Sequence, residues 1–123
     1  MQTTPVVSIV DDDLAVRRAL GSLVRSLGWE ARLFESAEAF LASGEASDTS
    51  CVISDIRMSG MSGVEMHERL VAQGAAPATI FISAYPTPAL EARAAHNGAL
   101  VLLQKPYHAS EMTHWLSVAL GRP

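Results

Sequence analysis

Cysteine and long hydrophobic runs are scarce in this sequence. Cys51 is the single cysteine, so an internal disulfide is excluded, and its place inside an apolar run predicts packing as a small hydrophobic residue. Apolar stretches extend over only a few residues, which excludes a membrane-spanning helix, and residues 1–7 lack the basic and long apolar regions of a signal peptide. These absences predict a cytoplasmic protein, in a reducing compartment, without a membrane partner.

Positive charge is scarce as well. The 9 Lys and Arg residues are outnumbered by 13 Asp and Glu residues, and no dense basic run offers counter-charge to a phosphate backbone. Direct binding of nucleic acid is therefore not expected. The 4 histidines lack metal-ligand spacing. His96 is expected to interact with the dipole of a helix C-terminus, and His67, His108 and His114 to lie at the surface or its boundary.

A chain of 123 residues, 49% of them hydrophobic, is long enough for one compact core. We therefore expect a single domain over residues 1–123. Short apolar runs without alternation predict strands buried on both faces of a parallel sheet, at residues 6–10, 51–54, 78–83 and 99–104. Residues 30–34 alternate charged and apolar side chains, which predicts an edge strand.

Helical patterns lie between these runs. Apolar residues from Val16 to Leu27 recur at helical spacing, and Gly28 is the expected C-cap. Four further helices are marked by an N-cap at Ser36, a capping box at Ser62 and Glu65, a start at Thr87–Pro88 with an end at Asn97–Gly98, and an apolar stripe from Met112 to Leu120. Residues 44–50 are polar and predict a loop. Strands alternating with helices predict a doubly wound α/β domain.

Polar side chains follow the predicted strands at their carboxyl ends, where open α/β sheets bind ligands. Asp11 and Asp12 follow the first strand, Asp55 the third, Ser83 the fourth and Lys105 the fifth. In a sheet of order 2-1-3-4-5 the first and third strands are neighbours. Asp11 and Asp12 would then face Asp55, and the serine and the lysine would approach from the other side.

Three carboxylates gathered in one crevice raise one another's pKa values unless a cation lies between them. Oxygen ligands with room for water are what Mg²⁺ prefers, with Mn²⁺ as the alternative ion. A carboxylate beside such an ion can attack a phosphoryl group. Asp55 is the best-placed nucleophile, Lys105 the counter-ion and Ser83 a hydroxyl donor to the phosphoryl group. Asp13 is expected to cap the first helix instead.

Five motifs together span nearly the whole chain: VDDD at 10–13, SDIRMSGMSGVEM at 54–66, ISA at 82–84, NGA at 97–99 and QKPY at 104–107. In this order and spacing they resemble the receiver domain of bacterial two-component response regulators. The resemblance implies a flavodoxin-like (βα)5 fold with a parallel sheet of order 2-1-3-4-5. It also implies that the protein is a signalling phosphoacceptor and not an enzyme. Such a phosphoacceptor takes its phosphoryl group from the phosphohistidine of a sensor histidine kinase.

The resemblance carries roles onto single residues. It implies that Asp55 becomes the 4-aspartylphosphate and that Asp11 and Asp12 bind the metal ion, one of them through water. Arg57 would offer its backbone carbonyl to the ion. Ser83 would be the switch hydroxyl and Lys105 the phosphate-binding lysine, whose bond to the following proline is usually cis in this family.

Two positions depart from the family pattern. Leu102 stands where the family usually has a Tyr or Phe that turns inward on activation, and Ser59 replaces a common Pro. With an incomplete internal switch, dimerisation or partner docking on the face of the fourth helix, fifth strand and fifth helix is expected to complete activation. SDIRM, MSGVE and SAEAF resemble the branch often fused to a helix-turn-helix output domain. The chain is either a stand-alone receiver or part of a longer regulator.

Three alternatives remain open. A phosphatase of the haloacid-dehalogenase kind also uses Asp and Mg²⁺, but its motif needs Asp-x-Asp-x-Thr/Val on the first strand, and Ala15 occupies the last position here. A receiver-like binding module would keep the fold without phosphorylation, and the intact acidic, hydroxyl and lysine set argues against it. A flavin-binding protein is disfavoured because an acidic crevice without metal repels a phosphate group.

Overall fold

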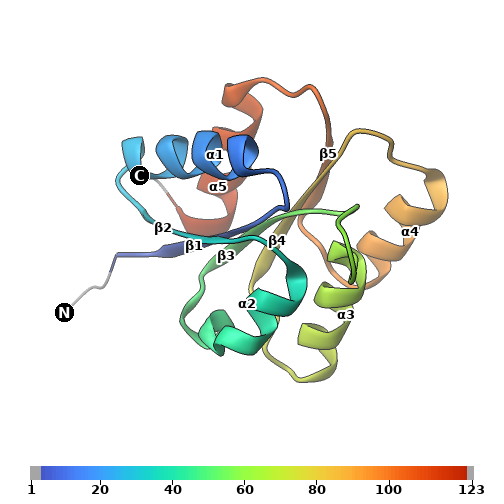
Figure 1. Cartoon of the computed structure of the whole chain (residues 1–123). Coiled ribbons are helices and arrows are strands. Elements are labelled where there is room, and N and C mark those ends of the chain that lie inside the picture. The colour runs from blue at the N-terminus through green and yellow to red at the C-terminus, as the bar shows by residue number, and fades with distance from the viewer. Residues whose placement is uncertain (1–3, 122–123) are drawn as a thin grey trace.

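A computed structural model describes residues 4–121 (Figure 1). Within this range the strands are β1 (Val6–Val10), β2 (Glu30–Phe34), β3 (Cys51–Asp55), β4 (Ala78–Ser83) and β5 (Val101–Gln104). The α-helices are α1 (Leu14–Ser26), α2 (Ala37–Ser43), α3 (Gly63–Ala72), α4 (Pro88–His96) and α5 (Ala109–Leu120). A short 3-10 helix, η1 (Glu45–Asp48), follows α2.

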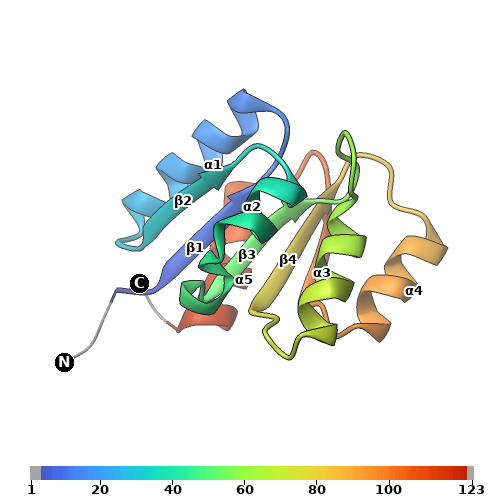
Figure 2. The ribbon, with the colours of Figure 1, turned by 60° about the horizontal axis from the view of Figure 1, so that its bottom comes forward.

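The strands form one parallel sheet of order β2-β1-β3-β4-β5, as predicted. Helices α1 and α5 cover one face, and α2, α3 and α4 cover the other (Figures 1 and 2). The two central strands β1 and β3 are buried along their whole length because helices pack on both of their faces. The edge strand β2 is partly exposed, in agreement with its alternating sequence.

Helix starts follow the predicted caps. The Asp13 carboxylate accepts a hydrogen bond from the Ala15 N–H at the start of α1, which confirms its capping role. The side chains of Ser36, Ser62 and Thr87 cap α2, α3 and α4 in the same way. The predicted loop at 44–50 is partly wrong, because residues 45–48 form η1, where the Thr49 hydroxyl donates to the Glu45 carbonyl.

The sheet divides the core into two parts. Between the sheet and helices α1 and α5, aliphatic side chains of the strands pack with Trp29, Met112 and Leu116. Cys51 belongs to this part, where burial raises the pKa of its thiol to about 12, so the predicted packing role is confirmed. The opposite part contains Phe40 and Phe81. None of the helices in the described residues has the length and apolarity needed to cross a bilayer.

One expectation about the histidines is wrong. His67 in α3 is 2% exposed and packs edge-on against Phe81, with ring centroids 5.5 Å apart. Its Nδ1 atom is buried and has no hydrogen-bond partner among residues 4–121. Burial lowers the pKa of His67, and the nearby charge of Glu68 only partly opposes this effect. His67 therefore folds as a neutral ring beneath the helix layer.

Replacing His67 with leucine should reduce the loss in the free energy of unfolding that occurs as the pH falls. The unfolded state takes up a proton on this ring near the ordinary pKa of 6.5, whereas the folded state does so only at lower pH. The ring's contribution to the free energy of unfolding is therefore complete above pH 6.5 and is lost as the pH falls below it. Urea unfolding of wild type and His67→Leu between pH 7.5 and 5 measures the difference.

The comparison of the two proteins also isolates His67 from other titrating groups. Asp11 has a raised pKa of about 6, so its contribution changes in the same pH range with the opposite sign. That contribution cancels in the difference between the two proteins. At pH 7.5 the free energy of unfolding of His67→Leu should exceed that of wild type by about 1 kcal/mol, because a buried nitrogen without a hydrogen-bond partner is removed. If the free energy of unfolding changed with pH in the same way in both proteins, the lowered pKa of His67 would be contradicted.

Candidate functional site

The carboxyl ends of four strands bring polar side chains to one edge of the sheet. Asp11 follows β1 and is fully buried, Asp55 ends β3 with 9% exposure, and Ser83 ends β4 with 1% exposure. Lys105 follows β5 and keeps 27% of its side chain exposed. Because the strands are parallel, these residues share an edge although Asp11 and Lys105 lie far apart in the chain.

Lys105 lies between the two buried carboxylates. Its Nζ atom donates a hydrogen bond to Asp55 Oδ2 at 2.9 Å and lies 3.9 Å from Asp11 Oδ2. The other oxygen of Asp55, Oδ1, accepts a hydrogen bond from the Arg57 N–H at 3.0 Å. The arrangement holds the Asp55 carboxylate in one orientation and leaves its side chain 13% exposed. A reagent arriving at the sheet edge can reach this carboxylate.

The electrostatics of the pocket follow from burial and from the shared negative charge. Burial raises the pKa of Asp11 from 3.8 to about 6, and the charge of Asp55 adds to the rise. Lys105 opposes the rise. Burial alone would lower the pKa of Lys105, but its hydrogen bond with Asp55 and the charges of both carboxylates outweigh burial and raise it. Lys105 is therefore a cation held by the acidic pair.

One carboxylate oxygen of the acidic pair accepts no hydrogen bond from the described residues. Asp11 Oδ1 accepts a hydrogen bond from the Asp13 N–H at 2.9 Å, whereas Asp11 Oδ2 is buried and has no hydrogen-bond partner in residues 4–121. A buried carboxylate oxygen without a partner is costly unless a cation or a donor satisfies it. This atom faces the Lys105 side of the pocket and has the chemistry of a ligand for a hard divalent cation.

The predicted third carboxylate is arranged differently. Asp12 is exposed, and its Oδ2 accepts a hydrogen bond from the Ser59 N–H at 3.1 Å. Across the described part of the chain, no three acidic, histidine or cysteine side chains gather as a set of metal ligands. The structure thus brings Asp11, Asp55 and Lys105 together and ties Asp12 to the loop after β3.

Ser83 and Arg57 take part in the site through hydrogen bonds with neighbouring backbone and with Asp55. The Ser83 hydroxyl accepts a hydrogen bond from the Tyr85 N–H at 3.2 Å. The Ser83 carbonyl accepts from the Lys105 N–H at 2.8 Å, which joins the ends of β4 and β5. Arg57 contributes its N–H to Asp55, and the role predicted for its carbonyl stays a prediction. The peptide bond from Lys105 to Pro106 is cis, as the family resemblance implied.

Two hydrogen bonds of the β3–α3 loop were not predicted from the sequence. Asp12 holds the Ser59 N–H from one side, and the Glu38 carboxylate in α2 accepts from the Met61 N–H at 3.1 Å on the other. The hydrogen bond to Met61 is the main reason that the pKa of Glu38 is lowered. No spacing rule joins residues this far apart in the chain, so neither contact could be predicted from the sequence.

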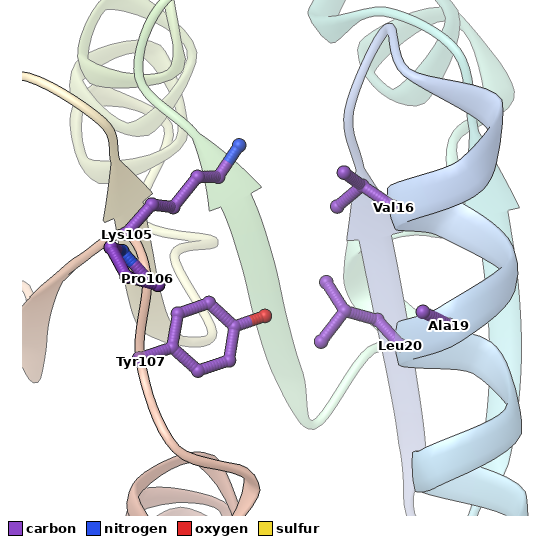
Figure 3. Close-up of a pocket in the computed structure, with 6 residues that line it drawn as sticks. All are labelled: Val16, Ala19, Leu20, Lys105, Pro106 and Tyr107. Atoms are coloured by element: carbon purple, nitrogen blue, oxygen red, sulfur yellow. The ribbon is translucent and has the colours of Figure 1, made fainter.

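An apolar groove opens beside the site. It has a volume of about 430 Å³ and lies between α1 and the segment that follows β5. Val16 and Leu20 point into it from α1, and Tyr107 faces them across the groove, while the Lys105 side chain extends past its upper end (Figure 3). The groove therefore offers an apolar surface next to the reactive pocket.

Leu102 lies on the other side of the site. It pairs with Phe81 in the β4–β5 register and packs against a cluster under α4, which contains Ile56, Val64 and Ala94. Its side chain thus links the strand next to Ser83 with α4.

Comparison with known proteins agrees with this geometry. Residues 7–117 match the family described as "Response regulator receiver domain". The chain is 36% identical over 115 residues to the transcriptional regulatory protein TdiR of Thauera aromatica, covering 94% of this chain and 51% of that protein. It is 36% identical over 116 residues to the transcriptional regulatory protein FixJ of Azorhizobium caulinodans, covering 94% and 55%. The chain thus spans about half the length of these curated relatives.

Solved structures give the same result. The low-resolution structure of the response regulator StyR superposes with a TM-score of 0.88 at 35% identity, covering 96% of this chain and 60% of that chain. The crystal structure of FixJ-N superposes with a TM-score of 0.83 at 30% identity, covering 97% and 94%. With the sheet order and the family match, these comparisons show that the chain belongs to the receiver domains of two-component response regulators.

Proposed function

We propose that this domain accepts a phosphoryl group on Asp55 from the phosphohistidine of a sensor histidine kinase. The observation that carries the proposal is the contact between Lys105 Nζ and Asp55 Oδ2 at 2.9 Å in a pocket that remains open to solvent. A lysine in this place can move from the carboxylate to an incoming phosphoryl oxygen without leaving the pocket. The domain match to response regulators supports the same role.

The residues of the chain divide the transfer between them. A carboxylate oxygen of Asp55 forms the new O–P bond as the P–N bond to the donor histidine breaks, and the leaving imidazole keeps the electron pair of that bond. Lys105 neutralises one phosphoryl oxygen, and the Ser83 hydroxyl donates a hydrogen bond to another. The Arg57 N–H keeps the attacking carboxylate oriented. The product is an acyl phosphate on this chain, so the reaction is stoichiometric.

A divalent cation, Mg²⁺ with Mn²⁺ as the alternative, fits the acidic side of this pocket. Asp11 Oδ2 supports this fit, since this buried oxygen accepts no hydrogen bond and its contact with the Lys105 ammonium is long, at 3.9 Å. The ion would be held by Asp11, Asp12, Asp55 and the carbonyl of Arg57. When bound, the ion supplies positive charge that offsets the negative charge of the phosphoryl group.

Removing the lysine charge should slow the labelling of Asp55. Lys105→Met keeps the length of the side chain but leaves the phosphoryl oxygen without its charged donor. A hydrogen bond to a charged group contributes about 1.5–3 kcal/mol, which predicts labelling by acetyl phosphate about ten- to a hundredfold slower than in wild type. Lys105→Arg should lie between the two proteins, because it keeps the charge with another geometry. Wild-type rates in Lys105→Met would contradict the assigned role.

The proposal is tested on wild type by its mass after treatment with acetyl phosphate. We expect one added phosphoryl group per chain with Mg²⁺ present and almost none after chelation of the metal. Continuous hydrolysis of a phosphomonoester would instead favour the phosphatase alternative. Failure to label under any of these conditions would favour a binding module without phosphorylation.

We further propose that the signal leaves through the face formed by α4, β5 and α5. Ser83 lies four positions before Thr87, the N-cap of α4, and Leu102 links β5 to α4, so a change at Ser83 can reach this face. Shifting a two-state population from 1:99 to 99:1 needs about 5.5 kcal/mol, whereas one charge-assisted hydrogen bond contributes about 1.5–3 kcal/mol. Leu102 has no polar tip to add to this sum. Association with a second copy is expected to supply the rest.

Phosphorylation should therefore change both the mass in solution and the exchange of amide hydrogens on this face. We expect a shift from monomer towards dimer in light scattering, together with slower amide exchange in α4, β5 and α5. Asp55→Asn treated with the same phosphodonor is the control. A monomer that shows slower exchange only with a different protein bound would replace the second copy with that partner. Unchanged mass and unchanged exchange would contradict the proposed face.

A phosphoacceptor needs a kinase that supplies the phosphoryl group and an output that receives the signal. The apolar groove between α1 and Tyr107 supports docking of the kinase helix that carries the phosphohistidine, because it lies directly beside Lys105. Since the relatives are about twice as long and are transcriptional regulators by name, we propose that an output domain receives the signal. Location in the cytoplasm and the absence of direct nucleic-acid binding by this domain stay predictions from the sequence.

A further inference from the structure

The loop after β3 carries a backbone donor that the usual family pattern lacks. Ser59 stands where a proline is common, and proline has no N–H. In this chain the Ser59 N–H donates to Asp12 Oδ2 at 3.1 Å, across 47 residues of sequence. Both residues are exposed, so the hydrogen bond lies at the mouth of the pocket and not in the core.

This hydrogen bond uses one of the carboxylates on which the metal site depends. Asp11 and Asp55 alone are buried together at Lys105, and no third acidic side chain joins them as a ligand set in residues 4–121. The carboxylate of Asp12 is the missing third group, and its Oδ2 is occupied by the Ser59 amide. An amide donor on a carboxylate withdraws part of the charge that attracts a cation and also fixes the side-chain rotamer.

We infer that the Ser59 backbone amide competes with the divalent cation for Asp12. Ser59 is therefore a positioning residue, which keeps Asp12 on the loop until the ion displaces the amide. The inference rests on the proposed metal site and adds to it a chain-specific reason for weaker binding of the ion. The loop does not depend on this hydrogen bond alone, because Glu38 holds the Met61 N–H two residues later.

Two variants of the whole chain test the competition. Ser59→Pro removes the N–H, and Ser59→Ala keeps the N–H while removing the hydroxyl. The dissociation constant for Mg²⁺ is measured for both by calorimetry at constant ionic strength, without any phosphodonor. Loss of one exposed hydrogen bond predicts that Ser59→Pro binds Mg²⁺ about three- to tenfold more tightly than Ser59→Ala. Equal or weaker binding by a folded Ser59→Pro would overturn the inference.

Wild type gives a second measurement in case the proline disturbs the loop. Exchange of the Ser59 amide with water, followed by NMR, should become several-fold faster when Mg²⁺ saturates the protein. The Met61 amide is the internal control, since its acceptor Glu38 lies outside the metal site and its exchange should stay constant. Unchanged exchange at Ser59 with Mg²⁺ bound would overturn the inference alone. Absence of any Mg²⁺ binding to wild type would overturn the proposed metal site as well.

Discussion

Asp55→Asn is expected to abolish labelling by acetyl phosphate completely. Asparagine keeps the volume of the side chain, and its one carbonyl oxygen can still accept the hydrogen bond from the Arg57 N–H, so the backbone around the pocket should keep its shape. The hydrogen bond from Lys105 is lost, because the amide group that takes the place of Oδ2 is a donor. The variant also loses the anionic oxygen that attacks phosphorus, since an amide oxygen is a far weaker nucleophile. The expected mass after treatment is therefore that of the untreated variant.

Asp13→Asn is the matched control for this loss. It removes a carboxylate close to the pocket, but Asp13 caps α1, and asparagine is an equally good N-cap. This variant should label as wild type does and unfold at nearly the same urea concentration. Labelling of Asp55→Asn with one phosphoryl group, with its fold intact, would show that another residue is the acceptor.

Gly63→Ala is expected to lose about 3 kcal/mol of stability or more, and to disturb the site at the same time. Gly63 is the first residue of α3, and a Cβ atom there would collide with the backbone carbonyl of Asp55 and approach the Ser54 hydroxyl. The carbonyl belongs to a buried central strand and cannot move aside. Overpacking against a rigid backbone is at the severe end of such substitutions. Urea unfolding measures the loss.

Gly21→Ala separates this collision from the general effect of alanine in a helix. Gly21 lies inside α1, where a Cβ atom would approach the Leu33 side chain at 3.3 Å. Leu33 is on the edge strand and 36% exposed, so its side chain can move. Because alanine favours the helix over glycine by about 1 kcal/mol, this variant should be as stable as wild type or more stable. Equal losses in both variants would contradict the proposed close approach at Gly63.

Much of the fold could be predicted because its strands are parallel and buried. Strands β1 and β4 coincide with the apolar runs, since a strand covered on both faces needs an unbroken apolar sequence. The run at 99–104 overshot β5, because Ala99 and Leu100 bond instead to the end of α4 and to Thr79. Apolar composition does not distinguish a strand from the half-buried connection that leads into it.

The site was predictable where topology alone decides it. The sheet order brings Asp11, Asp55 and Lys105 to one edge whatever the details of the loops, and the ion pairs of Lys105 follow from that. Asp12 is different, since its carboxylate turns to Ser59 through a contact that depends on the exact path of the β3–α3 loop. Burial of His67 could have been predicted, because it lies on the apolar face of α3 with Val64 and Leu70.

The most direct test of the account locates the phosphoryl group on the chain. Acyl phosphates are reduced by borohydride, which converts a phosphorylated aspartate to homoserine, and peptide mass spectrometry then identifies the position. After treatment of wild type with acetyl phosphate and Mg²⁺, we expect homoserine at position 55 and at no other aspartate. Homoserine at position 11 or 12, or a phosphoryl group bound elsewhere with position 55 unchanged, would contradict the central claim that Asp55 is the acceptor.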